Sequence, residues 1–324
     1  MSQTASNLNP LPELPPVEAP TAGFIIQLFV IPALIVGVVI VVWLLFGKLA
    51  GGESNARTYV ERLKGDSADW RSAYELANLI QNDSNLANDG ELLGELTALL
   101  DQELTTDANP KFDQYLVQTL GWFQTLDAKP VGGKLVDPLA TLSAALAPKQ
   151  ANLIRIGAAV SLAKQGARLD GKLDSDEAVV ALTEASTTSE PEIRQVAIYA
   201  LGFMDGEAAV TALKASLHDE DRYARYNAAI ALGRKGDPTA VSVFREMLSP
   251  QLMGQAIKFE TKSETDNKIE EIAIQGLEAL QVSIKVGNPS LALLLRPDIE
   301  ELTKAGLLSV RTRANELLKQ LPAR

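Results

Sequence analysis

After Gly51 and Gly52, the hydrophobic and polar positions follow the period of amphipathic helices almost without interruption. The clearest register is Arg-x-x-Ala-x-x-x-Leu, in which the apolar residues share one helix face. Its copies are Arg155/Ala158/Leu162, Arg194/Ala197/Leu201, Arg225/Ala228/Leu232 and Arg311/Ala314/Leu318, with a degenerate copy at Glu270/Ala273/Leu277. A short turn and a second helical stretch follow the middle copies. The pattern predicts an all-α fold of stacked helix pairs.

The distances between copies vary, and the variation falls in the loops. Two segments, ARLDGKLDS and the region around SPQLMGQAIKFETKSE, lengthen two of the intervals while the helical register is kept. Repeat arrays tolerate insertions of this kind because each unit contacts only its neighbours. The spacing therefore favours a solenoid.

Two stretches, IRQVAIYALGFMDGEAAVTAL and ARYNAAIALGRKGDPTAVSVF, resemble HEAT repeats of the short bilin-lyase type. That family's common form is V-R-x-x-A-A-x-A-L-G followed by D-P-x-A-V. The likeness is good over residues 150–250 and 310–318 and weak over 69–147, which we interpret as divergent or capping repeats. The resemblance implies an α-solenoid and specifies no activity.

The recurring arginines Arg155, Arg194, Arg225 and Arg311 have two interpretations. An exposed row of arginines would bind anions. In the pattern of the resembled family, the arginine instead satisfies carbonyls or acids of the adjacent repeat turn, a role for which Glu190 and Asp221 are placed. The structural role is favoured, because pairing explains the regular spacing.

The N-terminal part has a different pattern. Between Phe24 and Phe46 the only side chains with hydrogen-bonding groups are Gln27 and Trp43. Twenty-three helical residues span about 34 Å, enough to cross a hydrocarbon core of about 30 Å. We expect a disordered Pro-rich tail (1–22), a transmembrane helix (23–48), a linker (49–68), divergent or capping helical repeats (69–148) and HEAT-like repeats (149–324).

The orientation of this predicted anchor follows from the basic residues near its ends. No Lys or Arg precedes the apolar run, so a cleavable signal peptide is disfavoured. Lys48, Arg57, Arg62 and Lys64 follow it closely. The positive-inside tendency then places the N-terminus outside and the C-terminal body in the cytoplasm.

Composition argues against most chemistry. The chain has no cysteine, a single histidine (His218) and a net charge of −11. An acidic body repels phosphate backbones, so we expect no nucleic-acid partner. VGGKL lacks the spacing of a phosphate loop, and DGKLDSDE lacks the order of a calcium loop. His218 beside Asp219 to Asp221 is weak as a metal site. We predict no catalytic residue, no metal ligand and no cofactor.

A helical wheel drawn from the recurring arginine places positions +3, +6 and +7 in the core and positions +1 and +5 on the opposite, open face. Those positions hold mostly apolar or aromatic residues, namely Ile156, Val160, Gln195, Tyr199, Tyr226 and Ile230. An exposed strip of this kind indicates a partner-binding surface. The alternative, equally open at this point, is that another part of the same chain covers it.

These observations favour a membrane-anchored adaptor, held by residues 24–46, whose solenoid binds another protein, in particular a subunit of a membrane complex. The alternative is a membrane-associated lyase or isomerase of the bilin-lyase HEAT type, which requires a closed pocket with convergent polar groups. Oligomerisation through the anchor alone is weaker, because the segment has the lone Gly37 and no G-x-x-x-G motif.

Overall fold

A computed structural model describes residues 34, 36–42, 56–64, 70–106 and 109–322. The chain divides into two units, 1–54 and 55–324. In the first, residues 34 and 36–42 are helical, whereas the predicted tail (1–22) and most of the predicted transmembrane helix (23–48) lie outside the described residues. None of the helices within the described residues combines the length and apolar character that crossing a membrane requires.

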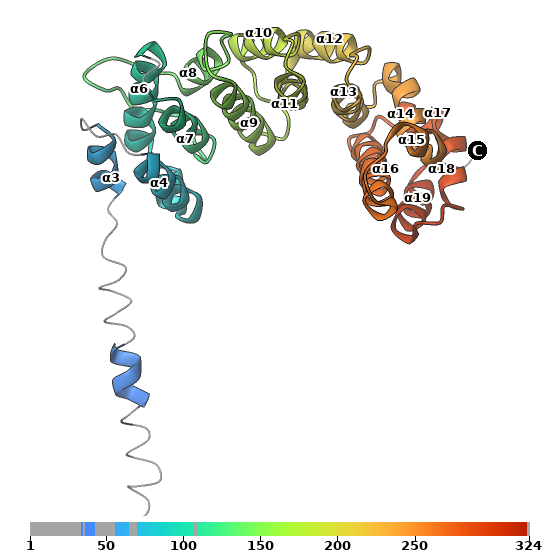
Figure 1. Cartoon of the computed structure of the whole chain (residues 1–324), viewed down its shortest axis with the longest axis horizontal. Helices are drawn as coiled ribbons and strands as arrows, with labels where there is room; N and C mark the ends of the chain where they lie inside the picture. Colours follow the sequence, from blue (N-terminus) through green and yellow to red (C-terminus); the bar gives the residue numbers. More distant parts are fainter. Residues whose placement is uncertain (1–33, 35, 43–55, 65–69, 107–108, 323–324) are drawn as a thin grey trace, which may run out of the picture. The chain divides into compact units, whose positions relative to one another are not determined.

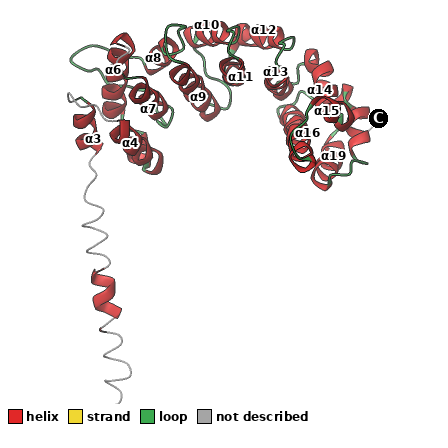
Figure 2. Ribbon diagram, in the orientation of Figure 1, coloured by secondary structure: helices red, strands yellow, loops and turns green. Residues whose placement is uncertain are grey.

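The second unit is built from helices joined by turns and loops (Figures 1 and 2). Its described part contains two isolated β-bridges, Val131–Lys134 and Leu173–Met204, and no strand. The helices are α3 (Ala56–Leu63), α4 (Trp70–Asn82), α5 (Ser84–Ala87), α6 (Gly90–Thr106), α7 (Pro110–Leu120), α8 (Pro138–Ala144), α9 (Asn152–Arg168), α10 (Asp176–Ala185), α11 (Pro191–Leu201), α12 (Gly206–Ser216), α13 (Arg222–Arg234), the 3-10 helix η2 (Pro238–Ala240), α14 (Val241–Met247), α15 (Pro250–Ala256), α16 (Lys262–Lys285), α17 (Ser290–Leu294), α18 (Arg296–Leu302) and α19 (Leu308–Gln320).

These helices form two layers. In the first layer α4, α7, α9, α11, α13, α16 and α19 each pack against the next. In the second layer α6, α8, α10 and α12 do the same, and α10 and α12 pack on α11 and α13 respectively (Figure 1). Stacked helix pairs in two layers are an α-solenoid, as the repeat pattern predicts.

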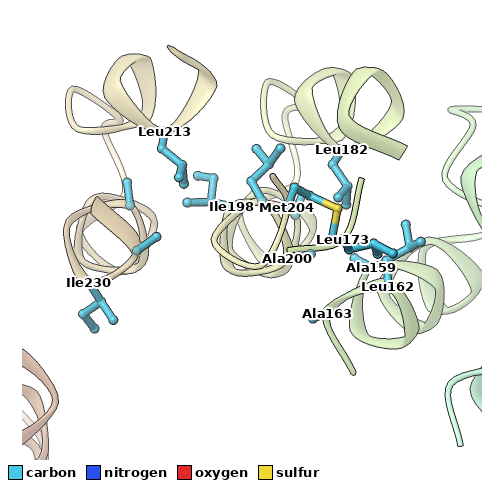
Figure 3. Packing of buried hydrophobic residues seen from close by; sticks show 14 of the residues in the cluster. Ala159, Leu162, Ala163, Leu173, Leu182, Ile198, Ala200, Met204, Leu213 and Ile230 are labelled. Carbon is cyan, nitrogen blue, oxygen red and sulfur yellow. The ribbon is translucent and has the colours of Figure 1, made fainter. Parts of the chain in front are cut away.

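The alanines and leucines of the repeat register fill the space between the layers. Ala158, Ala197 and Ala228 are fully buried, and so are the leucines four residues later. Figure 3 shows Leu182 of α10 and Leu213 of α12 pointing toward the first layer. Each buried leucine contributes about 2 kcal/mol by leaving water, and the small alanines let neighbouring helices approach closely.

Close packing between repeats also requires glycine near the C-terminal ends of first-layer helices. A Cβ atom on Gly202 would lie 2.8 Å from the Cβ atom of Ala231 on α13. One on Gly166 of α9 would lie 2.6 Å from the Cβ atom of Phe203, which follows α11. Neighbouring repeats therefore touch through backbone at these points, where any side chain would collide.

Two expected boundaries differ from the structure. The stretch expected as a linker, 49–68, contains the helix α3, which packs on α4 through Val60 and Leu63. The expected division at 148/149 falls inside a continuous stack, because α7 packs directly on α9 across it. The insertion after residue 248 forms α15 and lengthens α16 to 24 residues, since its start carries a capping box between Thr261 and Glu264.

Candidate functional site

The four recurring arginines are turned toward the backbone of their own repeats. Each donates to main-chain carbonyls in the turn before its helix. The acceptors are the Leu146 carbonyl for Arg155, those of Thr188 and Ser189 for Arg194, those of Asp219 and Glu220 for Arg225, and that of Ala305 for Arg311. These contacts satisfy carbonyls that the turn leaves without partners, so the arginines act as internal links of the stack.

The acids that the sequence suggested as partners have other roles. Glu190 accepts hydrogen bonds from the hydroxyls of Thr188 and Ser189, and these bonds lower the pKa of its carboxyl. Asp221 caps α13 by accepting from the Ala224 amide. The partner of Arg194 is Asp219 of the following repeat, at 3.1 Å. Glu190 was therefore a wrong assignment, because the link runs forward to the next repeat.

The strip of six residues predicted to bind a partner is not continuous. Ile156, Val160 and Gln195 are half-buried, and Tyr199 is 44% exposed. Tyr226 and Ile230 are buried, which corrects the expectation of an open face. The Tyr226 hydroxyl donates to Glu246 of α14 at 2.7 Å, and both burial and this bond raise its pKa. On α13 the second interpretation of the strip therefore holds, because another part of the same chain covers these residues.

The exposed end of this strip borders a hollow of about 400 Å³ between α11, α13 and α16, which we call the Arg234 hollow. Tyr199 and Ile230, two of the six predicted residues, help to line it. The other lining residues are Asn227, Ala231, Arg234, Gln275, Glu278, Ala279 and Val282. The hollow therefore combines an apolar floor and polar walls with one cation.

Arg234 is the distinctive group of this hollow. Its guanidinium carbon lies 5.3 Å from the ring centroid of Phe203, and Tyr199 packs edge-on against the same ring at 5.1 Å. Burial lowers the pKa of Arg234, and no carboxylate within the described ranges comes within 4.0 Å of its guanidinium. The nearby Glu278 is bound by Arg313 at 3.2 Å. The guanidinium donors thus face the hollow with no carboxylate in salt-bridge contact, while Glu278, which lines the same hollow, acts on Arg234 electrostatically in the direction that raises its pKa.

One further hollow adjoins this one, and another lies at the end of α9. The second shares Arg234 and Val282 with it and adds Lys172, Phe203 and Lys235. The third lies around Trp122, Lys164 and Arg168, at the last turn of α9, where the second hollow also begins. Lys164 lies over the Trp122 ring, with its Nζ atom 3.3 Å from the centroid, and burial lowers its pKa.

These side chains occupy one register of the repeat. Lys164, Phe203 and Arg234 stand nine positions after Arg155, Arg194 and Arg225, and Trp122 follows the Leu120-Gly121 pair that ends α7. We call these four residues the aromatic–cation ladder. The sequence reasoning missed them because it followed positions +1 and +5. The signal was present in the residue after each helix-ending Leu-Gly pair, in LGW, LGF and LGR.

The residues considered for metal binding are placed differently. His218 is exposed, while the neighbouring Asp219 and Glu220 are bound to Arg194. Within the described ranges no group of three or more His, Asp or Glu is arranged to hold a metal ion. Ser175, in the acid-rich loop, caps α10 by accepting from the Ala178 amide. Ser175 thus caps a helix, and Asp219 and Glu220 bind the arginine of the preceding repeat.

A larger hollow, about 690 Å³, lies between α15, α16, α18 and α19. On its wall Lys304 pairs with Glu301 at 2.8 Å, and Asp298 pairs with Arg245, which lies outside the wall, at 3.6 Å. Lys262, at the start of α16, is exposed. The Arg234 hollow has the stronger claim to a ligand, because its cation is half-buried and has no carboxylate in salt-bridge contact among the described residues.

Comparison with known proteins supports the repeat assignment. Residues 139–225 match the model for HEAT repeats, and residues 224–249 match the model for the PBS lyase HEAT-like repeat. No curated protein matches the chain.

Several solved structures are similar in part. An engineered protein is 16% identical, with 82% of this chain and 68% of that chain covered and a TM-score of 0.44. A designed armadillo repeat protein is 13% identical, with coverages of 82% and 99% and a TM-score of 0.36. Human deoxyhypusine hydroxylase in complex with glycerol is 16% identical, with coverages of 85% and 98% and a TM-score of 0.30. The matches to HEAT-type repeat models thus cover residues 139–249, where the helices stack in pairs.

Proposed function

We propose that this protein is a non-enzymatic scaffold whose first helix layer binds a segment of another protein. The observation that carries the proposal is the Arg234 hollow, where a half-buried cation faces open space and has no carboxylate in salt-bridge contact within the described part of the chain. A desolvated charge costs free energy unless it is paired, so such a group favours a ligand that supplies the missing acceptor.

The lining of the hollow suits binding better than catalysis. Its walls come from three different repeat helices, and they combine Asn227 and Gln275 with apolar side chains. Amide groups fix the orientation of a bound backbone, whereas proton transfer needs a group that titrates near neutral pH. A peptide segment lying across α11, α13 and α16 uses all of these features.

Membrane tethering is a further part of the proposal. Residues 24–46 anchor the chain, with the N-terminus outside and the solenoid in the cytoplasm, and the partner belongs to a membrane complex. The support is the apolar run, in which Gln27 is the one amide side chain, and the basic residues that follow it. A tether raises the effective concentration of the solenoid near such a partner, so a weak contact is sufficient.

The binding surface can be tested by crosslinking in native membranes. A photoreactive phenylalanine analogue at Tyr199 samples the hollow, and the same analogue at Val180 is the matched control, because Val180 is 68% exposed on α10 of the second layer. We expect a discrete crosslinked protein from position 199 and none from position 180. The same product from both positions, or none from either, contradicts the proposal.

Anchoring is tested separately by alkaline carbonate extraction of the full chain and of a variant lacking residues 24–46. We expect the full chain to stay with the membrane and the variant to be released. Protease added to the outside of intact cells should leave the solenoid whole if it faces the cytoplasm. Release of the full chain by carbonate contradicts the anchor and leaves the binding surface untouched.

A further inference from the structure

The aromatic–cation ladder runs across successive repeats with a strict alternation. Trp122, Lys164, Phe203 and Arg234 follow one another at the ends of α7, α9, α11 and α13, aromatic then cation then aromatic then cation. Each cation covers the ring of the preceding repeat, Lys164 over Trp122 and Arg234 over Phe203. Repetition over four repeats indicates one extended surface rather than a single local contact.

The cations of this surface differ from those that have a carboxylate in contact elsewhere in the described part of the chain. Lys214, Arg222, Lys268 and Arg313, for example, each have a carboxylate within 3.5 Å. Lys164 and Arg234 have rings beneath them and no such acid, although the protein carries a net charge of −11. Arg168, Lys172 and Lys235 add to the positive charge of the surface, whose acidic residues are Asp170, Asp205 and Glu278.

A helix C-terminus by itself attracts cations, because its carbonyls carry partial negative charge. That effect explains exposed residues such as Arg168. It does not explain why Arg234 and Lys164 are half-buried between aromatic rings and open hollows, since an exposed cation serves the helix end equally well. Burial of a cation without an acid costs free energy, and a bound acidic group offsets that cost.

We propose that the aromatic–cation ladder binds an extended acidic segment of a partner protein; this inference rests on the scaffold function proposed above. Neighbouring first-layer helices lie about 9 Å apart, so Lys164 and Arg234, two repeats apart, are separated by roughly 18 Å. An extended chain covers that length in about five or six residues. The segment therefore carries two acidic residues at that spacing, and an apolar side chain between or beside them meets Tyr199, Val282 and Val286.

Other anionic partners fit less well. Single-stranded nucleic acids stack bases on open aromatic faces, whereas Lys164 and Arg234 already cover the faces of Trp122 and Phe203. A flat anionic membrane cannot enter hollows between helices. A narrow peptide chain with carboxylate side chains fits the shape of the hollows and is complementary to the charge of Lys164 and Arg234.

The test uses the full-length chain in detergent micelles and a fluorescein-labelled synthetic peptide. Its two glutamates stand about six residues apart with leucine between them, and the matched peptide has glutamine in their place. Fluorescence anisotropy measures both affinities. We expect the glutamate peptide to bind at least about ten-fold more tightly, and its affinity to fall as salt is raised.

Variants locate the binding. Lys164→Gln and Arg234→Gln are each expected to weaken the glutamate peptide about ten-fold, while Lys149→Gln, an exposed residue in the loop before α9, changes its affinity less than about two-fold. Lys172→Gln, exposed in the second hollow, weakens binding about three-fold and provides a variant whose folding does not depend on burial. Thermal unfolding of each variant separates lost binding from lost structure.

The inference is overturned if the glutamate and glutamine peptides bind equally, or if Lys149→Gln weakens binding as much as Arg234→Gln. It is also overturned if Arg234→Gln and Lys164→Gln abolish binding of oligouridylate or of phosphatidylserine vesicles and leave the glutamate peptide unaffected. Should the Tyr199 crosslink persist in any of these cases, the scaffold function stands and only the acidic partner is withdrawn.

Discussion

The Arg194 guanidinium on α11 and the Asp219 carboxylate before α13 form a two-point contact, with Nε 3.1 Å from Oδ2 and Nη2 3.2 Å from Oδ1. The same guanidinium donates to the carbonyls of Thr188 and Ser189 at 3.0 Å. One side chain thus joins the turns of two consecutive repeats. Parallel N–H donors facing both carboxylate oxygens are the strongest form of ion pair in proteins.

Neutralising Asp219 should weaken the stack. The Asp219 side chain is 11% exposed, so Asp219→Asn leaves Arg194 with a nearly buried charge and should lower the free energy of unfolding by about 3 kcal/mol. Urea denaturation followed by circular dichroism measures the loss. Glu220→Gln is the control, because Glu220 contacts the same arginine at 3.2 Å but is 88% exposed. Its loss should stay below about 0.5 kcal/mol, and equal losses would refute the argument.

Gly202 should not tolerate a methyl group. In Gly202→Ala the new Cβ atom would lie 2.8 Å from the Ala231 Cβ atom, on a rigid helix that cannot yield cheaply. We expect a loss of about 2 kcal/mol in the free energy of unfolding. Gly254→Ala is the matched change within α15, where the nearest atom is 3.7 Å away, and it should stabilise by about 0.5 kcal/mol. Similar midpoints of thermal unfolding for the two variants would contradict the close approach.

Tyr226→Phe removes the hydroxyl that donates to Glu246 and should cost about 1 kcal/mol at pH 7. Burial, with the bond to Glu246, raises the pKa of Tyr226 in the folded state. The neutral hydroxyl therefore contributes stability that is complete below the unfolded pKa of about 10 and is lost as the pH rises further. The unfolding free energy of the parent protein should fall toward that of Tyr226→Phe above pH 10. A constant difference between the two curves would show that Tyr226 does not titrate with unfolding.

Asp237 gives the opposite pH dependence. Burial alone would raise the pKa of its carboxyl, but the hydrogen bonds from Thr239 and Lys214 outweigh burial and lower it. Its stabilisation is therefore present above the unfolded pKa of about 3.9 and is lost as the pH falls through the lower folded value. Asp237→Asn keeps the cap on η2 and removes the charge facing Lys214 at 2.9 Å. We expect a loss of about 0.5 kcal/mol at pH 7 that shrinks as the pH falls below the unfolded pKa of about 3.9, measured by urea denaturation; a loss that does not change with pH would refute the assignment.

The helix pairs could be predicted because their cause is local. The Arg-x-x-Ala-x-x-x-Leu register places Ala158 and Leu162 on one face, and a face of this kind has to be buried against another helix. The membrane anchor also depends on a local property, the apolar run from 24 to 46, and stays a prediction because most of that run lies outside the described residues.

The candidate site could not be located from the register alone. The helical wheel predicts that Tyr226 on α13 faces solvent. In the structure Tyr226 is buried and donates a hydrogen bond to Glu246 of α14. Sequence distance likewise suggested Glu190 for Arg194, whereas the stacking of repeats delivers Asp219 from 25 residues away. In the sequence Lys164 and Arg234 look like ordinary cations at helix ends. Only the structure shows that each lies over an aromatic ring of the preceding repeat.

The sequence by itself determined the type of element, the spacing of the repeats and the residues that face the core, because periodicity and side-chain size act within one helix. The tertiary structure decided which acid pairs with which arginine, which part of the predicted strip stays open and which cations are left without partners. Those outcomes depend on how each repeat is placed against the next, and contacts between repeats are made by residues far apart along the chain.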